Sequence, residues 1–273
     1  MAQAVGVLPE EQALVSRGHK IFSKSNANKS SATNGYKVFM DDELRVIFQT
    51  SLLSEAERPA DFWLPMLGLF TGGRISELTQ LDIVDIQKHG DVWAISINDE
   101  GDESVKTLAA DRLIPLHPTF IDCGFLEYVN DAKEHGTKLL SHLTSDTFGS
   151  WGATLSKRWG KHLDKFGIKD KQKVFHSFRS TSNDKLKQNG VPDESRCQFI
   201  GHEHDTVNSS IYSNPDSLPC LLEHVAKKLD YPGIDLKPLK YQPHQLSKML
   251  AHLCAKNASM ERHRKAKAAR LGT

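Results

Sequence analysis

The chain has 273 residues, 38% of them hydrophobic, which predicts one large globular domain or two smaller ones with room for a sizeable core. Its formal net charge is only +1 at pH 7, so the overall charge gives no sign of a nucleic-acid-binding protein. No apolar run reaches the length of a membrane span and the N-terminus has no signal-peptide pattern, so we expect neither membrane insertion nor secretion.

The positive charge is concentrated in two segments. Residues 157–187 contain ten Lys or Arg against three Asp or Glu, and residues 240–273 contain eight against one, so each segment carries a balance of +7. A basic stripe of this kind suits a phosphate backbone, although a lysine-rich solvated surface has the same composition.

The cysteines and histidines do not indicate a metal site. Four cysteines occur without a C-x-x-C pair, which we interpret as reduced thiols of a cytosolic protein. Thirteen histidines include no H-E-x-x-H motif, and no Cys/His cluster has the spacing of a structural zinc site.

Residues 1–37 are predicted to form an N-terminal extension that includes a flexible linker rich in serine and asparagine. The pattern then changes, because Asp41 and Asp42 can cap a helix whose apolar face includes Leu44 and Ile47. Residues 61–70 are apolar almost throughout, which predicts a buried helix that ends in a turn at residues 71–73.

Arg74 follows two glycines at the start of a short predicted helix. Backbone N–H groups at a helix start and the close approach that glycine permits both favour phosphate binding, with Glu77 as a partner that orients the turn. The alternative is a surface ion pair between Arg74 and Glu77, which would contribute only about 0.3–0.5 kcal/mol.

Residues 92–98 alternate in polarity and predict a strand. A polar turn separates them from a second strand region, which begins at Lys106 and ends in the segment 112–117, so we expect a small antiparallel sheet near residues 90–117. Lys106 could reach a phosphate from this hairpin as a general acid. By spacing alone, an ordinary exposed lysine explains it better.

Helices are predicted over residues 120–132 and 147–166. The second carries a continuous apolar stripe at helical spacing, which indicates core packing rather than base stacking. The stripe consists of Phe148, Trp151, Leu155, Trp159, Leu163 and Phe166. Five cations on or after this helix are the candidate DNA-binding residues: Lys157, Arg158, Lys161, Lys171 and Lys173.

The segment 176–212 holds a concentrated set of reactive side chains. His176 and Arg179 form a His-x-x-Arg motif and share one face if the segment is helical, and Gly201-His202 and Tyr212 follow. An arginine fork binds two phosphate oxygens, a histidine donates hydrogen bonds or moves protons near neutral pH, and a tyrosine can act as a covalent nucleophile. Taken singly, each residue also has a simpler explanation as a cap, a packing residue or a solvated charge.

We expect helices from His176 to about Gln188 and from Pro192 to near Gly201, followed by two amphipathic stretches after Pro215. Residues 231–273 are predicted to be a basic C-terminal tail that is frayed at its end.

The order of these motifs resembles the catalytic domain of the tyrosine recombinases, the phage integrase family, over roughly residues 38–230. The motifs are Arg74 in TGGRISEL, Lys106 before RLIPLH, the His176-x-x-Arg179 pair, Gly201-His202 and Tyr212. The resemblance implies an α+β, mainly helical fold with a small antiparallel sheet.

The resemblance also implies a role for each residue. Arg74 and Arg179 would clamp the scissile phosphate, and His202 would hydrogen-bond a nonbridging oxygen. His176 would help to accept the tyrosine proton. Lys106 would protonate the leaving 5′ oxygen, and Tyr212 would form a 3′-phosphotyrosyl link.

The implied function is site-specific DNA recombination of the phage or genomic-island type, by strand cleavage and rejoining that needs neither metal nor cofactor. The implied partners are double-stranded DNA, further copies of the chain up to a tetramer, and accessory DNA-bending or directionality factors, in the bacterial cytosol at the nucleoid. About 37 residues precede the catalytic domain, where the family usually has a helical core-binding domain. We therefore expect weak and strongly salt-dependent DNA binding by this chain alone.

Three alternatives remain open. One is relaxation of supercoils on the same residues, as in type IB topoisomerases, and synapsis of two DNA sites would distinguish it from recombination. A second is an inactive DNA-binding remnant, against which the presence of all six residues argues. A third is a metal-dependent phosphohydrolase, for which the carboxylate and histidine clusters of a two-metal site are missing.

Overall fold

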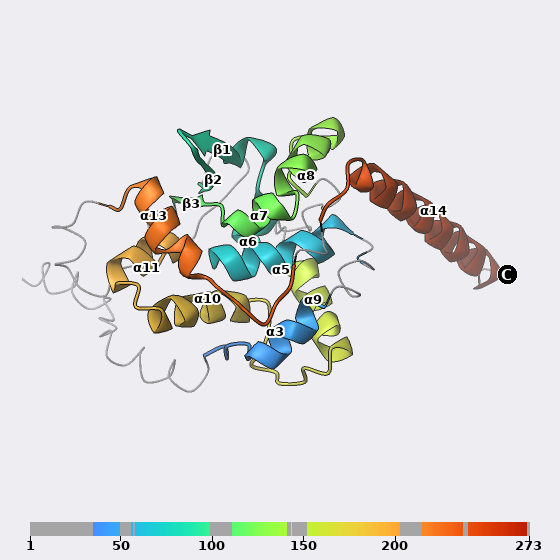
Figure 1. Cartoon of the computed structure of the whole chain (residues 1–273). Helices are drawn as coiled ribbons and strands as arrows, with labels where there is room; N and C mark the ends of the chain where they lie inside the picture. The colour runs from blue at the N-terminus through green and yellow to red at the C-terminus, as the bar shows by residue number, and fades with distance from the viewer. Residues whose placement is uncertain are drawn as a thin grey trace, which may run out of the picture. The chain divides into compact units, whose positions relative to one another are not determined.

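The computed structural model describes residues 35–49, 56, 58–98, 111–140, 143, 152–202, 215–236 and 240–271. Within these ranges the chain is mainly helical and has a three-stranded antiparallel sheet (Figure 1). The α-helices are α3 (Asp41–Ile47), α5 (Pro59–Thr71), α6 (Ile75–Gln80), α7 (Pro118–Asp122), α8 (Phe125–Ala132), α9 (Ala153–Lys165), α10 (Ser177–Gln188), α11 (Asp193–Ile200), α13 (Leu218–His224) and α14 (Gln245–Leu271). Short 3₁₀ turns occupy Ile83–Asp85, Lys133–His135 and Ala226–Lys228. The predicted α+β class is confirmed.

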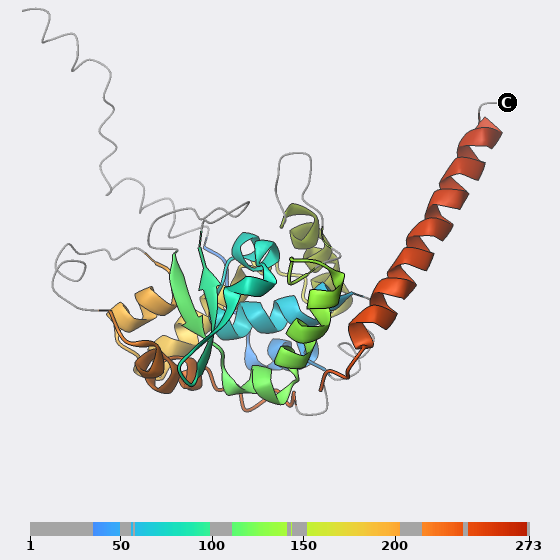
Figure 2. The ribbon, with the colours of Figure 1, turned by 90° about the horizontal axis from the view of Figure 1, so that it is seen from above.

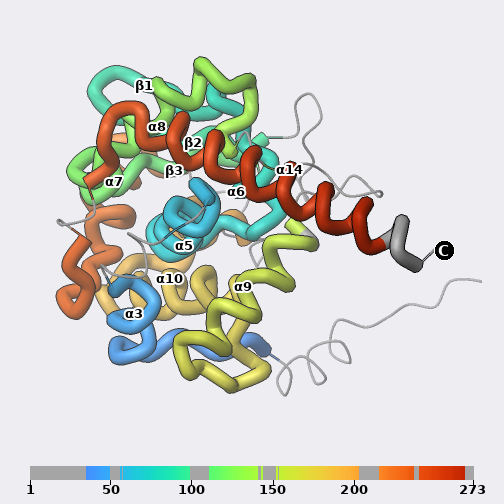
Figure 3. Tube along the Cα trace, turned by 90° about the vertical axis from the view of Figure 1, so that its right-hand side faces the viewer, coloured from blue at the N-terminus to red at the C-terminus, as the bar shows by residue number. Residues whose placement is uncertain are grey.

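Helix α5 lies at the centre of the domain. Figures 1 and 3 show α3, α9 and α10 on one side of it and α7, α8 and the sheet on the other. Eleven of its thirteen residues are buried, as expected for a helix that is apolar almost all round. The predicted buried helix over 61–70 is therefore confirmed.

Helix α3 begins one residue earlier than the predicted caps imply. Met40 is the N-cap residue, and its backbone N–H donates to the Glu43 carboxylate at 2.8 Å. Asp41 and Asp42 lie in the first helical turn, where negative charge is favourable at the positive end of the helix dipole.

The sheet has the order β1–β2–β3, with β1 (Ile86–His89), β2 (Val92–Ile97) and β3 (Arg112–Pro115), and its strands are drawn lengthwise as green arrows in Figure 2. The predicted pairing of residues 92–98 with the segment 112–117 is correct, with Ile95 opposite Ile114. Strand β1 is an addition: it pairs with β2 through the tight turn at Gly90 and Asp91, and a pattern of one buried and three exposed residues does not reveal it in the sequence.

Two predicted helices differ from the observed ones. The helix expected over 120–132 is split into α7 and α8, because Gly124 between them has a φ of +78° that a continuing helix cannot accommodate. The second, α9, begins at Ala153. Leu155, Trp159 and Leu163 are buried as predicted and Phe166 is partly buried, whereas Phe148 and Trp151 lie outside the described residues.

Helices α10 and α11 match their predicted ranges. Helix α10 packs against α5, and Ser182 ties the two together by donating to the Leu69 carbonyl at 2.6 Å. At Gly68 the helices come so close that an added Cβ would lie 3.2 Å from the Phe178 side chain of α10. This packing brings the C-terminal end of α5 next to the N-terminal end of α10.

The core continues past residue 230, where we expected the tail to begin, since it includes Tyr231, Leu236, Tyr241 and Leu246. The Asp131 carboxylate of α8 accepts from the Tyr241 hydroxyl at 2.8 Å. These contacts fix the start of α14, which packs on α8, whereas the later turns of α14 are mostly exposed. None of the helices in the described ranges combines the length and hydrophobicity needed to cross a bilayer.

Candidate active site

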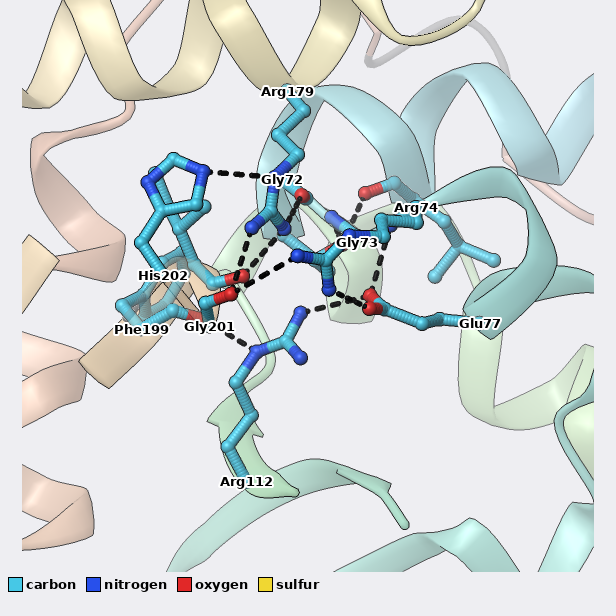
Figure 4. A network of polar contacts seen from close by, with 12 residues as sticks. Gly72, Gly73, Arg74, Glu77, Arg112, Arg179, Phe199, Gly201 and His202 are labelled. Carbon is cyan, nitrogen blue, oxygen red and sulfur yellow. Dashed lines mark hydrogen bonds and ion pairs between the residues drawn. The ribbon is translucent and has the colours of Figure 1, made fainter. Parts of the chain in front are cut away.

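The predicted phosphate site forms where α5, α6, α10, α11 and β3 meet (Figure 4). Helix α5 ends at Thr71, and the chain turns through Gly72 and Gly73 into Arg74, which is the N-cap residue of α6. The Thr71 hydroxyl holds this turn, because it donates to Leu67 at 2.6 Å and accepts from the Gly73 N–H at 3.0 Å. Arg74 is thereby presented at the junction of two helices.

Glu77 fixes Arg74 in two ways. Its carboxylate accepts the backbone N–H of Arg74 at 2.9 Å and pairs with the Arg74 guanidinium. The same carboxylate also binds Arg112 Nη2 at 3.1 Å. Glu77 is only 2% exposed, so this is a buried ion cluster rather than the surface pair that the sequence left as an alternative.

The pKa of Glu77 reflects these neighbours. Burial acts to raise the pKa of the carboxyl, but the Arg112 charge and the hydrogen bonds from Arg74 outweigh it, so the pKa lies below its usual value. Glu77 is therefore ionised at neutral pH and orients two arginines at once.

Arg179 is the centre of the site. It lies in the first turn of α10 and is only 2% exposed. Its Nη1 donates to the carbonyls of Gly72 at 2.8 Å and Ile200 at 2.5 Å, and its Nη2 donates to Gly201 at 2.9 Å. One guanidinium thus joins the end of α5 to the end of α11.

The end of α11 receives three arginines. The carbonyl of Phe199 accepts from Arg112 at 3.0 Å, and that of Gly201 accepts from both Arg179 and, at 3.4 Å, Arg74. The last carbonyls of a helix lack intrahelical partners and carry the negative end of the helix dipole. They offset much of the cost of burying these cations.

His202 is the residue after Gly201, and it contacts Arg179. Arg179 Nε donates to His202 Nε2 at 3.2 Å. Burial and the charges of Arg179 and Arg74 lower the pKa of His202 to about 4, so the imidazole is neutral near pH 7. With Nε2 as an acceptor, the proton is carried by Nδ1, which leaves that N–H group as a hydrogen-bond donor.

Arg179 stays charged despite its burial. Desolvation and the charges of Arg74 and Arg112 lower its pKa to about 9, which leaves it protonated at neutral pH. His176, the N-cap residue of α10, contacts Tyr36 in a tilted ring pair with centroids 5.0 Å apart and adds to the depression of the His202 pKa.

Four of the six predicted catalytic residues therefore come together: Arg74, His176, Arg179 and His202. Lys106 and Tyr212 lie outside the described residues. Among the described residues, no three His, Cys, Asp or Glu side chains form a group that could hold a metal ion.

The five candidate DNA-binding residues have two different environments. Lys157, Lys161 and Lys171 are exposed. In contrast, Arg158 pairs with Asp61, and Lys173 pairs with Glu43 at 2.5 Å. These last two cations already have carboxylate partners within the fold.

Arg112 is absent from the predicted site although it contacts Glu77 and Phe199. The signal that could have revealed it is its place in RLIPLH, where a charged residue takes a position on a strand that is otherwise buried.

The described residues thus form a mainly helical domain with a small antiparallel sheet, and Arg74, Arg179 and His202 meet at the end of α11. The sequence model of the phage integrase family matches residues 37–217, more than half of the chain, and the chain belongs to that family. No curated protein matches the sequence.

Solved structures show a more distant likeness. The XerH site-specific recombinase bound to palindromic difH substrate, in a post-cleavage complex, is 20% identical with a TM-score of 0.45, over 64% of this chain and 48% of that one. XerH bound to difH substrate in a pre-cleavage complex is 19% identical with a TM-score of 0.45, over 65% of this chain and 49% of that one. The lambda integrase catalytic core is 16% identical with a TM-score of 0.40, over 63% of this chain and 94% of that one. The chain thus spans about half the length of the XerH chains.

Proposed function

We propose that the chain catalyses site-specific DNA recombination of the phage or genomic-island integrase type, through a 3′-phosphotyrosyl intermediate. The observation that carries the proposal is the convergence of Arg74, Arg179 and His202 on the single turn that ends α11. Two charged guanidiniums and a neutral N–H donor suit the nonbridging oxygens of a phosphodiester.

In the proposed reaction the Tyr212 phenol oxygen attacks phosphorus while the bond from phosphorus to the 5′ oxygen breaks. The phenol proton passes to His176, and Lys106 gives a proton to the leaving 5′ oxygen. Rejoining is the reverse, with a 5′ hydroxyl attacking the phosphotyrosine, so that the energy of the diester bond is retained and no nucleotide cofactor is needed.

Electrostatics explain why this arrangement would accelerate the reaction. The pentacoordinate transition state gathers negative charge on the equatorial oxygens, so cations already held in place stabilise it more than the ground state. Arg179 supplies a charge that is already held in place, because four of its five N–H groups donate to His202 and to three backbone carbonyls. Removing one donor of this type costs on the order of 100- to 1,000-fold in rate.

We infer double-stranded DNA as the partner, bound in part by the exposed Lys157, Lys161 and Lys171. Such contacts release counterions, so affinity should fall steeply as salt rises. Self-association on DNA up to a tetramer, help from accessory DNA-bending factors and action at the bacterial nucleoid belong to the same proposal.

The test is a nicked suicide DNA substrate incubated with the wild type, Tyr212→Phe and Tyr231→Phe, with a metal chelator and without added metal. Tyr231 is a matched control, since its hydroxyl donates to the Leu69 carbonyl at 3.3 Å within the core. We expect a covalent protein–DNA adduct on denaturing gels for the wild type and Tyr231→Phe and none for Tyr212→Phe.

Other outcomes would overturn parts of the proposal. An adduct that persists in Tyr212→Phe would exclude this tyrosine as the nucleophile. DNA binding by the wild type without any adduct would favour a binding remnant. An adduct formed with supercoil relaxation but without synapsis of two sites would favour a topoisomerase.

A further inference from the structure

We propose that Arg112 is a positioning residue of the active site, which keeps Glu77 from neutralising Arg74 and holds the turn that carries His202. The inference rests on the proposed function, because the phosphate that Arg74 would bind belongs to it. Arg112 is the first residue of β3, and its contacts reach two other segments of the site (Figure 4).

The burial of Arg112 calls for a specific explanation. Its side chain is only 4% exposed, and desolvation lowers the pKa of its guanidinium while the Glu77 charge opposes that effect. Burying an ion pair costs several kcal/mol per ion unless geometry and hydrogen bonds compensate. Because of this cost, the buried Arg112 need not stabilise the fold, which points to a role in the site instead.

The geometry identifies that role as a bridge. Arg112 Nη2 donates to Glu77 Oε2 at 3.1 Å, and Arg112 Nε donates to the Phe199 carbonyl at 3.0 Å. Glu77 Oε2 also accepts the backbone N–H of Arg74. A shift of Arg112 would thus change both the carboxylate that orients Arg74 and the turn that precedes His202.

The packing at Gly201 shows how closely this bridge fits the turn. A Cβ added at Gly201 would lie 2.6 Å from Arg112 Nη1 and 2.8 Å from its central carbon. The guanidinium therefore lies directly against the residue before His202, and only a glycine leaves it room.

The charge balance gives the bridge a consequence for chemistry. Arg74, Arg112 and Arg179 contribute three positive charges and Glu77 one negative charge, a net of +2. Without Arg112 the net falls to +1, and Glu77 would pair with Arg74 alone. Arg112 therefore leaves Arg74 available to a phosphate whose negative charge grows in the transition state.

The experiment compares Arg112→Met and Arg112→Lys with the wild type in single-turnover cleavage of the suicide substrate. Methionine keeps the unbranched apolar stem without the guanidinium, and lysine keeps the charge but has no planar fork to reach Glu77 and Phe199 together. We expect Arg112→Met to slow cleavage by about 10- to 100-fold, since a misplacement of about 1 Å can cost 100-fold. The lysine variant should recover part of the rate, and DNA affinity should change little.

Arg196→Met is the matched control. Arg196 is a partly buried arginine of α11 that donates to Val191, Asn183 and Asp193, and none of these three residues belongs to the site. It should lower the melting temperature but not the cleavage rate. Arg112→Met is also combined with Arg74→Lys. If Arg112 acts through Arg74, its effect should shrink in that background, whereas additive losses would mean that Arg112 only supports the fold and would overturn the proposal.

A second measurement separates this proposal from the proposed function. Inorganic phosphate should raise the melting temperature of the wild type, and by less in Arg112→Met, whether or not the wild type forms an adduct. Equal stabilisation of both proteins by phosphate would refute the positioning role. An Arg112→Met variant that cleaves DNA at the wild-type rate would refute it as well. A missing wild-type adduct with unequal stabilisation would instead refute only the recombinase chemistry.

Discussion

Replacing Glu77 by glutamine removes the negative charge that lies among Arg74, Arg112 and Arg179 while leaving the size of the side chain unchanged. In the native protein this carboxylate accepts from the Arg74 backbone and pairs with both Arg74 and Arg112. Glutamine keeps one acceptor oxygen, but its NH₂ group would face a guanidinium instead of binding it.

The magnitude follows from burial. Glu77 is 2% exposed, and removing one partner of a buried ion pair costs about 3–5 kcal/mol because the other charge is left uncompensated. At roughly 2–4 °C per kcal/mol for a chain of this size, the melting temperature should fall by about 6–20 °C. This loss is a large part of the usual stability of about 5–15 kcal/mol.

The assay is urea and thermal unfolding of Glu77→Gln beside Glu223→Gln. Glu223 pairs with Lys227 on an exposed helix surface, where a pair contributes at most about 1 kcal/mol. If Glu77→Gln unfolds within about 1 kcal/mol of the wild type, the three arginines do not depend on this carboxylate, and the electrostatic account of the site is wrong.

Three further predictions follow from single features. Gly201→Ala should lower the melting temperature more than Gly190→Ala and should also lower adduct formation. The two glycines have similar φ angles of +76° and +75°, so the backbone strain of about 1–2 kcal/mol is the same in both variants. Only at Gly201 would the new Cβ meet Arg112. Acidification from pH 7.5 to pH 5 should lower the melting temperature, because burial lowers the pKa values of His117 and His202 to about 4, so the unfolded chain with pKa values near 6.5 binds more protons as pH falls. His117→Asn, which keeps the side-chain cap of α7, should reduce that pH dependence, and an unchanged slope would contradict the assignment of His117 as a half-buried neutral imidazole.

Strong local patterns account for the part of the fold that the sequence predicts. The apolar run of α5, the alternation of β2 and the capped ranges of α10 and α11 all follow from the spacing of apolar residues and glycines within single segments. Strand β1 has only one buried residue, and the break between α7 and α8 depends on the conformation of one glycine, so neither produces a clear period.

The candidate site also has a part that local sequence patterns predict and a part that they do not. Arg74, His176, Arg179 and His202 could be predicted because each belongs to a short motif in a recognisable order. The pairing of Glu77 with Arg112 could not, because it joins α6 to β3 over 35 positions, and no local pattern encodes a contact of that range. Lys106 and Tyr212 remain predictions.

The hydrogen bonds of Arg74 and Arg179 to the Gly201 carbonyl connect residues 127 and 22 positions apart. Contacts over long stretches of sequence form late, since the entropy of closing the loop must be overcome first. A partly folded chain would therefore contain isolated arginines and histidines but no assembled site. For the proposed DNA-cleaving activity, competence to cut would therefore coincide with completion of the fold.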